Sequence, residues 1–328
     1  MNSRLSSFLR DNTLVPETGR ICVFGATGET DLSTLPQDRT DVVQGLYPEA
    51  EALRARGFST KARPDAQVSL AIVCLPRAKA LAQAWIKEAV RITPNGTVVI
   101  DGQKTDGIES SLTACKKRVA LGGKLSKAHG KSFWFSSEAV FSDWGTLGAQ
   151  QQDDGYWRAP GVFSADGIDP ASEALVQALP QELGADIADL GAGWGYLSAQ
   201  ILVRKTVQKL QLIEADHAAL DCAKKNVKDP RASFFWDDAT SWTPAKPLDA
   251  VVMNPPFHTG RAATPDLGRA FIKTAARILK PAGQLFLVAN RHLPYEAELT
   301  ARFSVMKEVA GDNRFKILHA QKPTRPRR

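Results

Sequence analysis

The feature that most limits the possible folds is a repeated order of short apolar segments and helical segments. In the second half, segments typical of buried strands occupy residues 185–190, 209–214, 248–253 and 284–289. The segments 217–227 and 267–279 between them have apolar residues at helical spacing. Alternating strands and helices build a mostly parallel sheet with helices on both faces. Such sheets bind their ligands beyond the carboxyl ends of the strands.

The first half repeats part of this order. Residues 20–24 form an apolar segment that runs into a Gly turn, and the segment 68–75 is followed by Pro76. The segment from Trp85 to Ile100 also resembles the one from Phe271 to Leu287, with identical residues at a constant offset. This internal similarity predicts a duplication, and therefore two tandem Rossmann-like α/β domains. A polar segment near residue 150 places the domains at residues 1–150 and 151–328.

A glycine-rich loop follows the first strand of the second domain. Gly191, Gly193 and Gly195 alternate with Ala192 and Trp194, and a helix is expected to begin directly afterwards. Glycines allow a sharp turn and a close approach of the backbone to a ligand. Such loops also occur in dinucleotide-binding folds. An acid, Asp189, stands two positions before the first glycine. Its carboxylate suits a cationic amino group better than a pyrophosphate, which favours a cofactor that carries an amino acid.

Two further acids stand near the ends of the next predicted strands. Glu214 ends the second strand, where an acid can accept hydrogen bonds from both ribose hydroxyls of an adenosyl amino acid or of NAD. Asp216 is a nearby competitor for that role. Asp238 follows an apolar segment and could accept a hydrogen bond from an adenine amino group, or it could be an ordinary turn residue.

The most specific motif is Asn254-Pro255-Pro256-Phe257, at the end of the strand 248–253. Two prolines stiffen the chain and remove two backbone donors, so this corner offers carbonyl oxygens. The Asn and Pro carbonyls could accept both hydrogens of a planar amino group, and Phe257 could stack on the base that carries it. No strong general base is required, because the proton becomes acidic only as the new N–C bond forms. His258 is therefore expected to contact the loop or the substrate.

The charge distribution favours a polyanionic partner. The net charge is +7, and two stretches carry basic residues without any acid. The first lies between Glu109 and Glu138, and the second follows Asp312. A pair of solvated surface segments would give the same pattern. No apolar run is long enough to cross a membrane, and the N-terminus lacks the apolar core of a signal peptide, so a cytoplasmic protein is expected. Cys and His are too scattered to predict a metal site.

Taken in order, these motifs resemble those of class I S-adenosylmethionine methyltransferases. Flanking segments narrow the resemblance to the ribosomal RNA guanine-N2 methyltransferases of the RsmC and RlmG kind. The segments concerned are Pro160 to Ser164, Asp166 to Asp169, Ala289 to Tyr295 and Arg314 to Lys316. The similarity covers residues from about 158 to 320.

The resemblance implies that S-adenosylmethionine is the cofactor and that Phe163 and Asp169 line its pocket. Asp169-Pro170 also reads as a helix N-cap followed by proline. The family carries two tandem domains, the first degenerate, and the Phe24-Gly25-Ala26-Thr27-Gly28 turn indeed lacks the acid two positions before its glycine. The expected activity is methylation of a guanosine N2 in ribosomal RNA, with small-subunit RNA as first choice, by a monomer without a metal.

Three other functions fit part of the pattern. Asn-Pro-Pro-aromatic sites also methylate glutamine amides in proteins, although those motifs usually end in Tyr, where this chain has Phe257. Adenine-N6 methylation of DNA or RNA uses the same kind of amino group. A non-catalytic RNA-binding assembly factor would keep the basic segments but would not need Asn254.

Overall fold

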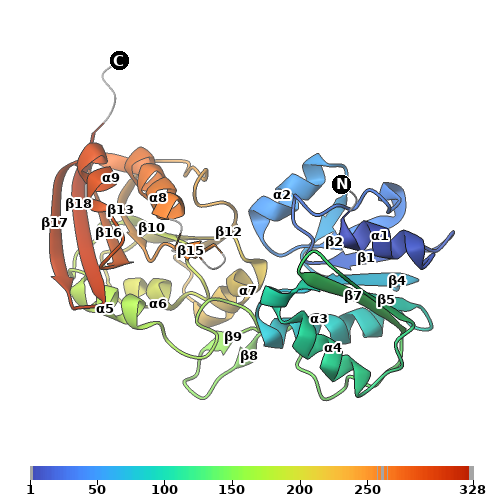
Figure 1. The fold of residues 1–328 in the computed structure, drawn as a ribbon. Coiled ribbons are helices and arrows are strands. Elements are labelled where there is room, and N and C mark those ends of the chain that lie inside the picture. Colours follow the sequence, from blue (N-terminus) through green and yellow to red (C-terminus); the bar gives the residue numbers. More distant parts are fainter. Residues whose placement is uncertain (1–2, 257, 260–261, 264, 325–328) are drawn as a thin grey trace. The chain divides into compact units, whose positions relative to one another are not determined.

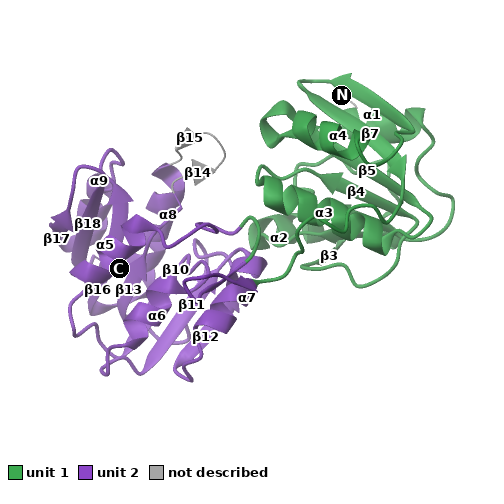
Figure 2. Ribbon diagram, turned by 90° about the horizontal axis from the view of Figure 1, so that it is seen from below, with its two compact units in different colours: residues 1–149, 159–161 green, residues 150–158, 162–328 purple. Residues whose placement is uncertain are grey.

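The computed structural model describes residues 3–256, 258–259, 262–263 and 265–324, and the chain divides into two compact units (Figures 1 and 2). Unit 1 contains residues 1–149 and 159–161, and unit 2 contains residues 150–158 and 162–328. Each unit is built around one seven-stranded sheet.

The sheet of unit 1 consists of five parallel strands and an antiparallel hairpin at one edge. Across the sheet the strands lie in the order β3 (Ser59–Lys61), β2 (Thr40–Val43), β1 (Ile21–Phe24), β4 (Leu70–Cys74), β5 (Thr97–Gln103), β7 (Gly130–Ser136) and β6 (Gly123–Lys127). The central strands β1, β2 and β4 are almost completely buried, and β1 and β4 accordingly have continuous apolar sequences.

Helices cover both faces of this sheet (Figure 1). α1 (Arg4–Asp11) and α2 (Tyr47–Ala55) pack on one face, and α3 (Lys79–Ile92) and α4 (Ile108–Lys116) pack on the other. α3 buries Ala82, Ile86 and Ala89, whose spacing of three to four residues places them on one side of the helix. Two short 3-10 helices, η1 (Gln37–Arg39) and η2 (Lys104–Asp106), lie in the connections.

The sheet of unit 2 repeats this arrangement strand by strand. Its order is β12 (Ala232–Trp236), β11 (Lys209–Glu214), β10 (Asp186–Leu190), β13 (Leu248–Met253), β16 (Leu279–Asn290), β18 (Phe315–Pro323) and β17 (Phe303–Gly311), and the last two strands again form an antiparallel hairpin. The two identical orders confirm the predicted pair of Rossmann-like folds. Two small ribbons add β8 (Gln150–Gln151) with β9 (Trp157–Arg158), and β14 (His258–Thr259) with β15 (Ala262–Ala263).

The helices of unit 2 also form two layers. α5 (Pro170–Ala178), α6 (Tyr196–Leu202) and α7 (His217–Asn226) pack on one face, and α8 (Pro265–Ile278) and α9 (Glu296–Arg302) on the other. In the described part of the chain, no helix has both the length and the apolar character that a membrane span requires.

Two details differ from the sequence pattern. Apolar residues predict a strand over 284–289, but β16 already begins at Leu279, because exposed residues such as Pro281 and Ala282 continue the extended backbone. The pattern also gave no sign of β17. This strand lies at the sheet edge with most of its side chains exposed, so it lacks the apolar periodicity that identifies a buried strand.

Candidate active site

The glycine-rich loop connects β10 to α6 and has a left-handed backbone at all three glycines. Gly191, Gly193 and Gly195 have φ values of 75°, 56° and 89°. The loop is fixed to the next strand, since the Gly191 and Ala192 amides donate to the Ile213 carbonyl at 2.9 and 3.0 Å. A Cβ atom at Gly193 would meet no atom within 4 Å. The loop therefore leaves open space at Gly193, as a backbone that approaches a ligand requires.

Asp189 is completely buried in β10, directly beneath this loop. Its Oδ2 atom accepts a hydrogen bond of 2.7 Å from the Ser198 hydroxyl, whereas Oδ1 is buried with no hydrogen-bond partner among the described residues. Burial raises the pKa of Asp189 to about 7. A buried oxygen without a donor costs about 1–3 kcal/mol, so this carboxylate suits a ligand with N–H or cationic groups.

Glu214 ends β11 and its carboxylate turns toward the glycine-rich loop. Oε2 accepts from the Gly193 amide and Oε1 from the Asp216 amide, both at 2.7 Å. Burial raises the pKa of Glu214 to about 7. Asp216 instead begins α7, where its carboxylate accepts from the Ala218 amide at 2.9 Å. The structure thus assigns helix capping to Asp216 and leaves Glu214 beside the loop.

Asp238 follows β12 and has a local role in the structure. Its Oδ1 atom accepts from both the amide and the hydroxyl of Thr240, at 2.8 and 2.7 Å. This is the geometry of an ordinary turn acid, which was one of the two interpretations of the sequence. The predicted contact between Asp238 and an adenine amino group stays a prediction.

Asn254 follows β13, and its side chain is held in one orientation. Its Nδ2 atom donates to Asp169 Oδ2 at 2.8 Å and to Ser172 Oγ at 2.9 Å. The same Asp169 oxygen accepts from the Ser172 amide at 2.8 Å and so caps α5. Because both bonds use the amide nitrogen, the Asn254 carbonyl oxygen points away from Asp169. Pro255 is buried and Pro256 is exposed.

One pocket brings the loop and the Asn-Pro-Pro corner together. It is lined by Phe163, Ser164, Asp169, Ser172, Gly191, Ala192, Gly193, Trp194, Tyr196, Leu197 and Asn254. The predicted residues Phe163, Asp169, Gly191, Gly193 and Asn254 therefore lie around one space. The predicted residues outside this lining are Asp189, Gly195, Glu214, Asp238, Pro255 and Pro256. Phe257 lies outside the described residues, and only the backbone of His258 is described, in β14.

Trp194 is a site residue that the sequence pattern did not identify. It is buried between two glycines of the loop, and its indole nitrogen donates to the Phe163 carbonyl at 3.0 Å. The Arg158 guanidinium lies 4.5 Å from the centre of its ring. Trp194 therefore fastens the segment that contains Phe163 over the loop. The position of a large tryptophan between Gly193 and Gly195 was the sequence feature that could have identified it as a site residue.

In the described residues, no group of three or more His, Cys, Asp and Glu side chains could hold a metal ion. What the site offers instead is a glycine-rich loop with open space at Gly193, buried carboxylates and an oriented amide carbonyl. These features fit a small zwitterionic cofactor next to a planar amino group.

Comparisons with known proteins agree with this arrangement. Residues 155–319 match the family model of the methyltransferase small domain. Ribosomal RNA small subunit methyltransferase C of Shewanella oneidensis is 30% identical over 288 residues, which cover 84% of this chain and 84% of that protein. The protein of the same name from Hahella chejuensis is 27% identical over 329 residues, covering 92% of this chain and 94% of that protein.

The whole fold also has a solved counterpart. The structure of the 16S rRNA N2 methyltransferase RsmC of T. thermophilus, in complex with AdoMet and guanosine, matches with a TM-score of 0.79 and 24% sequence identity. The match covers 95% of this chain and 90% of that chain, so the likeness of fold includes both units. The resemblance seen in the sequence is thereby confirmed: the chain belongs to the methyltransferase small domain family, and it is an S-adenosylmethionine-dependent methyltransferase.

Proposed function

We propose that this chain transfers the methyl group of S-adenosylmethionine to the exocyclic N2 atom of a guanosine in ribosomal RNA, with small-subunit RNA as the substrate. Two kinds of evidence support the proposal. The relatives from Shewanella and Hahella are named for small-subunit ribosomal RNA, and RsmC of T. thermophilus was solved with guanosine. The second is the oriented amide of Asn254 in the pocket of unit 2.

The Asn254 amide is the single observation that carries the proposal. An aromatic amine is a poor nucleophile, because its lone pair is delocalised into the ring. A carbonyl oxygen that accepts one of its hydrogens helps the nitrogen to become pyramidal. Asp169 and Ser172 both bind the Asn254 nitrogen, so the carbonyl oxygen is available on the other side without any reorientation of the side chain. Such preorganised acceptors are a main source of enzymatic rate enhancement.

The remaining parts of the site have separate tasks. S-adenosylmethionine, when bound, supplies a methyl group that its sulfonium makes electrophilic. Asp189 and Glu214 would hold the amino-acid and ribose parts, and the glycine-rich loop would leave room for the backbone to contact the cofactor. The Pro255 carbonyl would accept the second amino hydrogen, and Phe257 would stack on the base. The orientation of the two reactants then lowers the barrier without a general base.

The roles of the two units differ in this proposal. Unit 2 is catalytic, whereas unit 1 is a degenerate copy that binds no cofactor and contributes to the fold or to RNA binding. A guanine within a helix cannot reach a pocket of this kind, so the target nucleotide is unpaired or displaced. We further propose that the protein acts as a monomer in the cytoplasm.

The test is methyl transfer from labelled S-adenosylmethionine to four substrates: 16S ribosomal RNA, small ribosomal subunits, a glutamine-containing protein fraction and adenine-rich nucleic acid. Digestion of the RNA to nucleosides should place the label in N2-methylguanosine. Label in glutamine or in N6-methyladenosine would replace the proposed substrate by one of the alternatives. Binding of RNA without any transfer would favour the non-catalytic assembly factor.

A further inference from the structure

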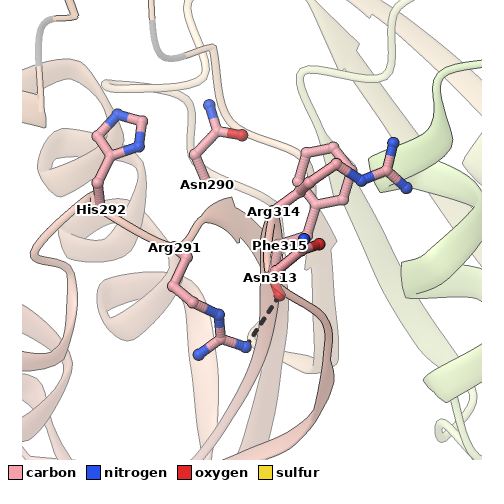
Figure 3. A pocket seen from close by; sticks show the side chains of 6 residues that line it. All are labelled: Asn290, Arg291, His292, Asn313, Arg314 and Phe315. Carbon is pink, nitrogen blue, oxygen red and sulfur yellow. Dashed lines mark hydrogen bonds between the residues drawn. The ribbon is translucent and has the colours of Figure 1, made fainter.

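A second pocket in unit 2 has a different composition from the cofactor pocket. It is lined by Asn290, Arg291, His292, Asn313, Arg314 and Phe315, which come from the end of β16 and from the turn that leads into β18 (Figure 3). The lining contains two guanidinium groups, two amides, an imidazole and an aromatic ring, and it contains no carboxylate. Nothing in the chemistry proposed above uses these side chains.

The position of this second pocket links it to Asn254. β13 and β16 are parallel neighbours with Met253 opposite Leu287, and Asn290 lies opposite Phe315 in the adjacent β18. Asn254 and Asn290 therefore both lie at the carboxyl ends of these two parallel strands. From ordinary strand spacing, the Asn254 and Phe315 Cα atoms are roughly 12 Å apart. This is close enough for two nucleotides of one strand to occupy the two pockets.

Arg291 is fixed within the wall of the second pocket. Its Nε atom donates to the Asp312 carbonyl at 2.6 Å, and Nη2 donates to the Phe315 carbonyl at 3.1 Å and pairs with Glu308 at 2.8 Å. These bonds connect the end of β16 to the turn between β17 and β18. Arg291 therefore shapes the pocket, and the paired Glu308 reduces the charge that it offers.

The Arg314 side chain is more exposed than that of Arg291. Its side chain is 63% exposed, and its guanidinium lies over the Phe315 ring at 5.1 Å from the ring centre (Figure 3). The Asp312 carboxylate is 3.4 Å from the guanidinium, and it also accepts from the Arg314 and Phe315 amides at 2.7 Å. The turn is thus rigid, while one face of the guanidinium stays accessible. Unpaired RNA bases stack on such guanidinium planes.

We propose that this second pocket binds the RNA nucleotide adjacent to the target guanosine. The base stacks on the face of the Arg314 guanidinium, the Asn290 and Asn313 amides contact the polar edge of the base, and the exposed N–H groups of Arg314 attract the phosphate. The inference rests on the proposed RNA methyltransferase function. It assigns a specific binding step to residues outside the cofactor pocket, so an unpaired strand of RNA, rather than a free nucleoside, is the preferred substrate.

The test compares Arg314→Ala with Arg302→Ala. Arg302 is also an exposed arginine with a carboxylate partner, Glu298. It directly precedes β17 and lies near the far end of β18, because Phe303 pairs with Pro323. Binding of a single-stranded 16S ribosomal RNA fragment is measured at several salt concentrations, together with KM and kcat for methyl transfer. Arg314→Ala should weaken RNA binding and raise KM roughly tenfold, with kcat nearly unchanged. The slope of log Kd against log salt should fall by about 0.7 if a phosphate contact is lost.

The two variants should bind S-adenosylmethionine equally well, which excludes damage to the fold. Equal RNA binding by Arg314→Ala and Arg302→Ala would overturn the second pocket as a subsite. That result would leave the proposed function intact, because methyl transfer by the wild-type protein is measured separately. A wild-type protein that binds RNA but transfers no methyl group would contradict the proposed function. The RNA affinities of Arg314→Ala and Arg302→Ala would still test the second pocket in that case.

Discussion

The two units have the same strand order, yet they differ at the positions where unit 2 is proposed to bind its ligands. In unit 2, Leu190 pairs with Ile213 and Met253 immediately before the loop. In unit 1, Phe24 pairs with Val43 and Val73 on the two equivalent neighbouring strands. These pairings give the equivalent positions. Asp189 corresponds to Val23, Glu214 to Gln44 and Asn254 to Cys74.

In unit 1 the replacements remove the side chains proposed to bind the cofactor and the amino group, but they keep the interior of the sheet packed. Val23 is completely buried, as Asp189 is, and it brings no unpartnered oxygen into the interior. Gln44 uses its amide within its own unit, donating to the Ala26 carbonyl and accepting from the Leu46 amide, both at 2.8 Å. Unit 1 also has only the 3-10 helix η1 between β1 and β2, where unit 2 has α6 after its glycine-rich loop.

An ion pair stabilises the corresponding edge of unit 1. Arg4 in α1 donates to both carboxylate oxygens of Asp101 in β5 at 2.8 Å, and its side chain is only 6% exposed. One fold therefore tolerates either arrangement. At this edge of unit 1 the Asp101 carboxylate and the Gln44 amide are satisfied within the unit. The equivalent edge of unit 2 has a buried Asp189 oxygen without a partner among the described residues, and an oriented Asn254 amide, an arrangement that suits a ligand.

The largest effect should come from the Asn254 position. Asn254→Ala removes the acceptor for the amino hydrogen and should lower kcat by about 10²–10³-fold. Cys74→Ala, at the equivalent position of unit 1, should leave kcat unchanged. Single-turnover methyl transfer to 16S ribosomal RNA measures both. A comparable loss in the two variants would mean that the units are not functionally distinct.

The next largest effect should come from Glu214, the acid at the end of β11. Glu214→Gln gives unit 2 the residue type of unit 1 and weakens hydrogen bonding to the ribose hydroxyls. Hydrogen bonds to charged groups contribute about 1.5–3 kcal/mol, so the Kd for S-adenosylmethionine should rise about 10–100-fold. The reverse change, Gln44→Glu, should create no second binding site. Calorimetric titration measures both, and an unchanged Kd in Glu214→Gln would exclude this carboxylate from the cofactor site.

A smaller effect should identify Asp169 as a positioning residue. Asp169→Ser keeps a good N-cap for α5 but is too short to reach the Asn254 amide. Asn254 could then rotate, and kcat should fall roughly tenfold, a loss equal to that of one moderate hydrogen bond. The Kd for S-adenosylmethionine should change little. A large rise in that Kd with an unchanged kcat would instead support the cofactor-pocket role that the resemblance implies for Asp169.

The smallest effect is a pH dependence that only unit 2 should show. Burial raises the pKa of both Asp189 and Glu214 to about 7. Each carboxyl favours the folded state when protonated, so the melting temperature without cofactor should fall as the pH rises through 7. Cofactor binding needs the ionised forms, so affinity should increase about threefold per group from pH 6.5 to 7.5. Asp189→Asn should reduce this slope, and a slope of opposite sign would contradict the assignment.

The local parts of the site were predictable from the sequence. The glycine-rich loop, Glu214 and the Asn-Pro-Pro corner each depend on neighbouring residues and on the end of a strand, and both kinds of signal are visible in a short segment. The mostly parallel sheet with helices on both faces followed in each half from the alternation of strands and helices, whereas the strand order did not. Unlike these features, the hydrogen bond between Asn254 and Asp169 joins residues 85 positions apart, and no local pattern encodes it.

Other features were hidden for different reasons. The role of Trp194 depends on a backbone carbonyl, that of Phe163, which any residue could supply. The choice between Glu214 and Asp216 depended on where β11 ends and α7 begins, because Asp is a favoured N-cap only if it directly precedes the helix. The pocket around Arg314 comes from a turn between two strands, one of which carries too few buried residues to be recognised.

We expect only unit 2 to hold the cofactor, beside an amide that is oriented for an amino group. The most direct test is equilibrium titration of labelled S-adenosylmethionine into the full chain, followed by light-induced crosslinking and peptide mapping. We predict one cofactor per chain, attached within residues 163–197 or near Asn254. Two cofactors per chain, or attachment around residues 23–28 of unit 1, would contradict the assignment of the cofactor site to unit 2.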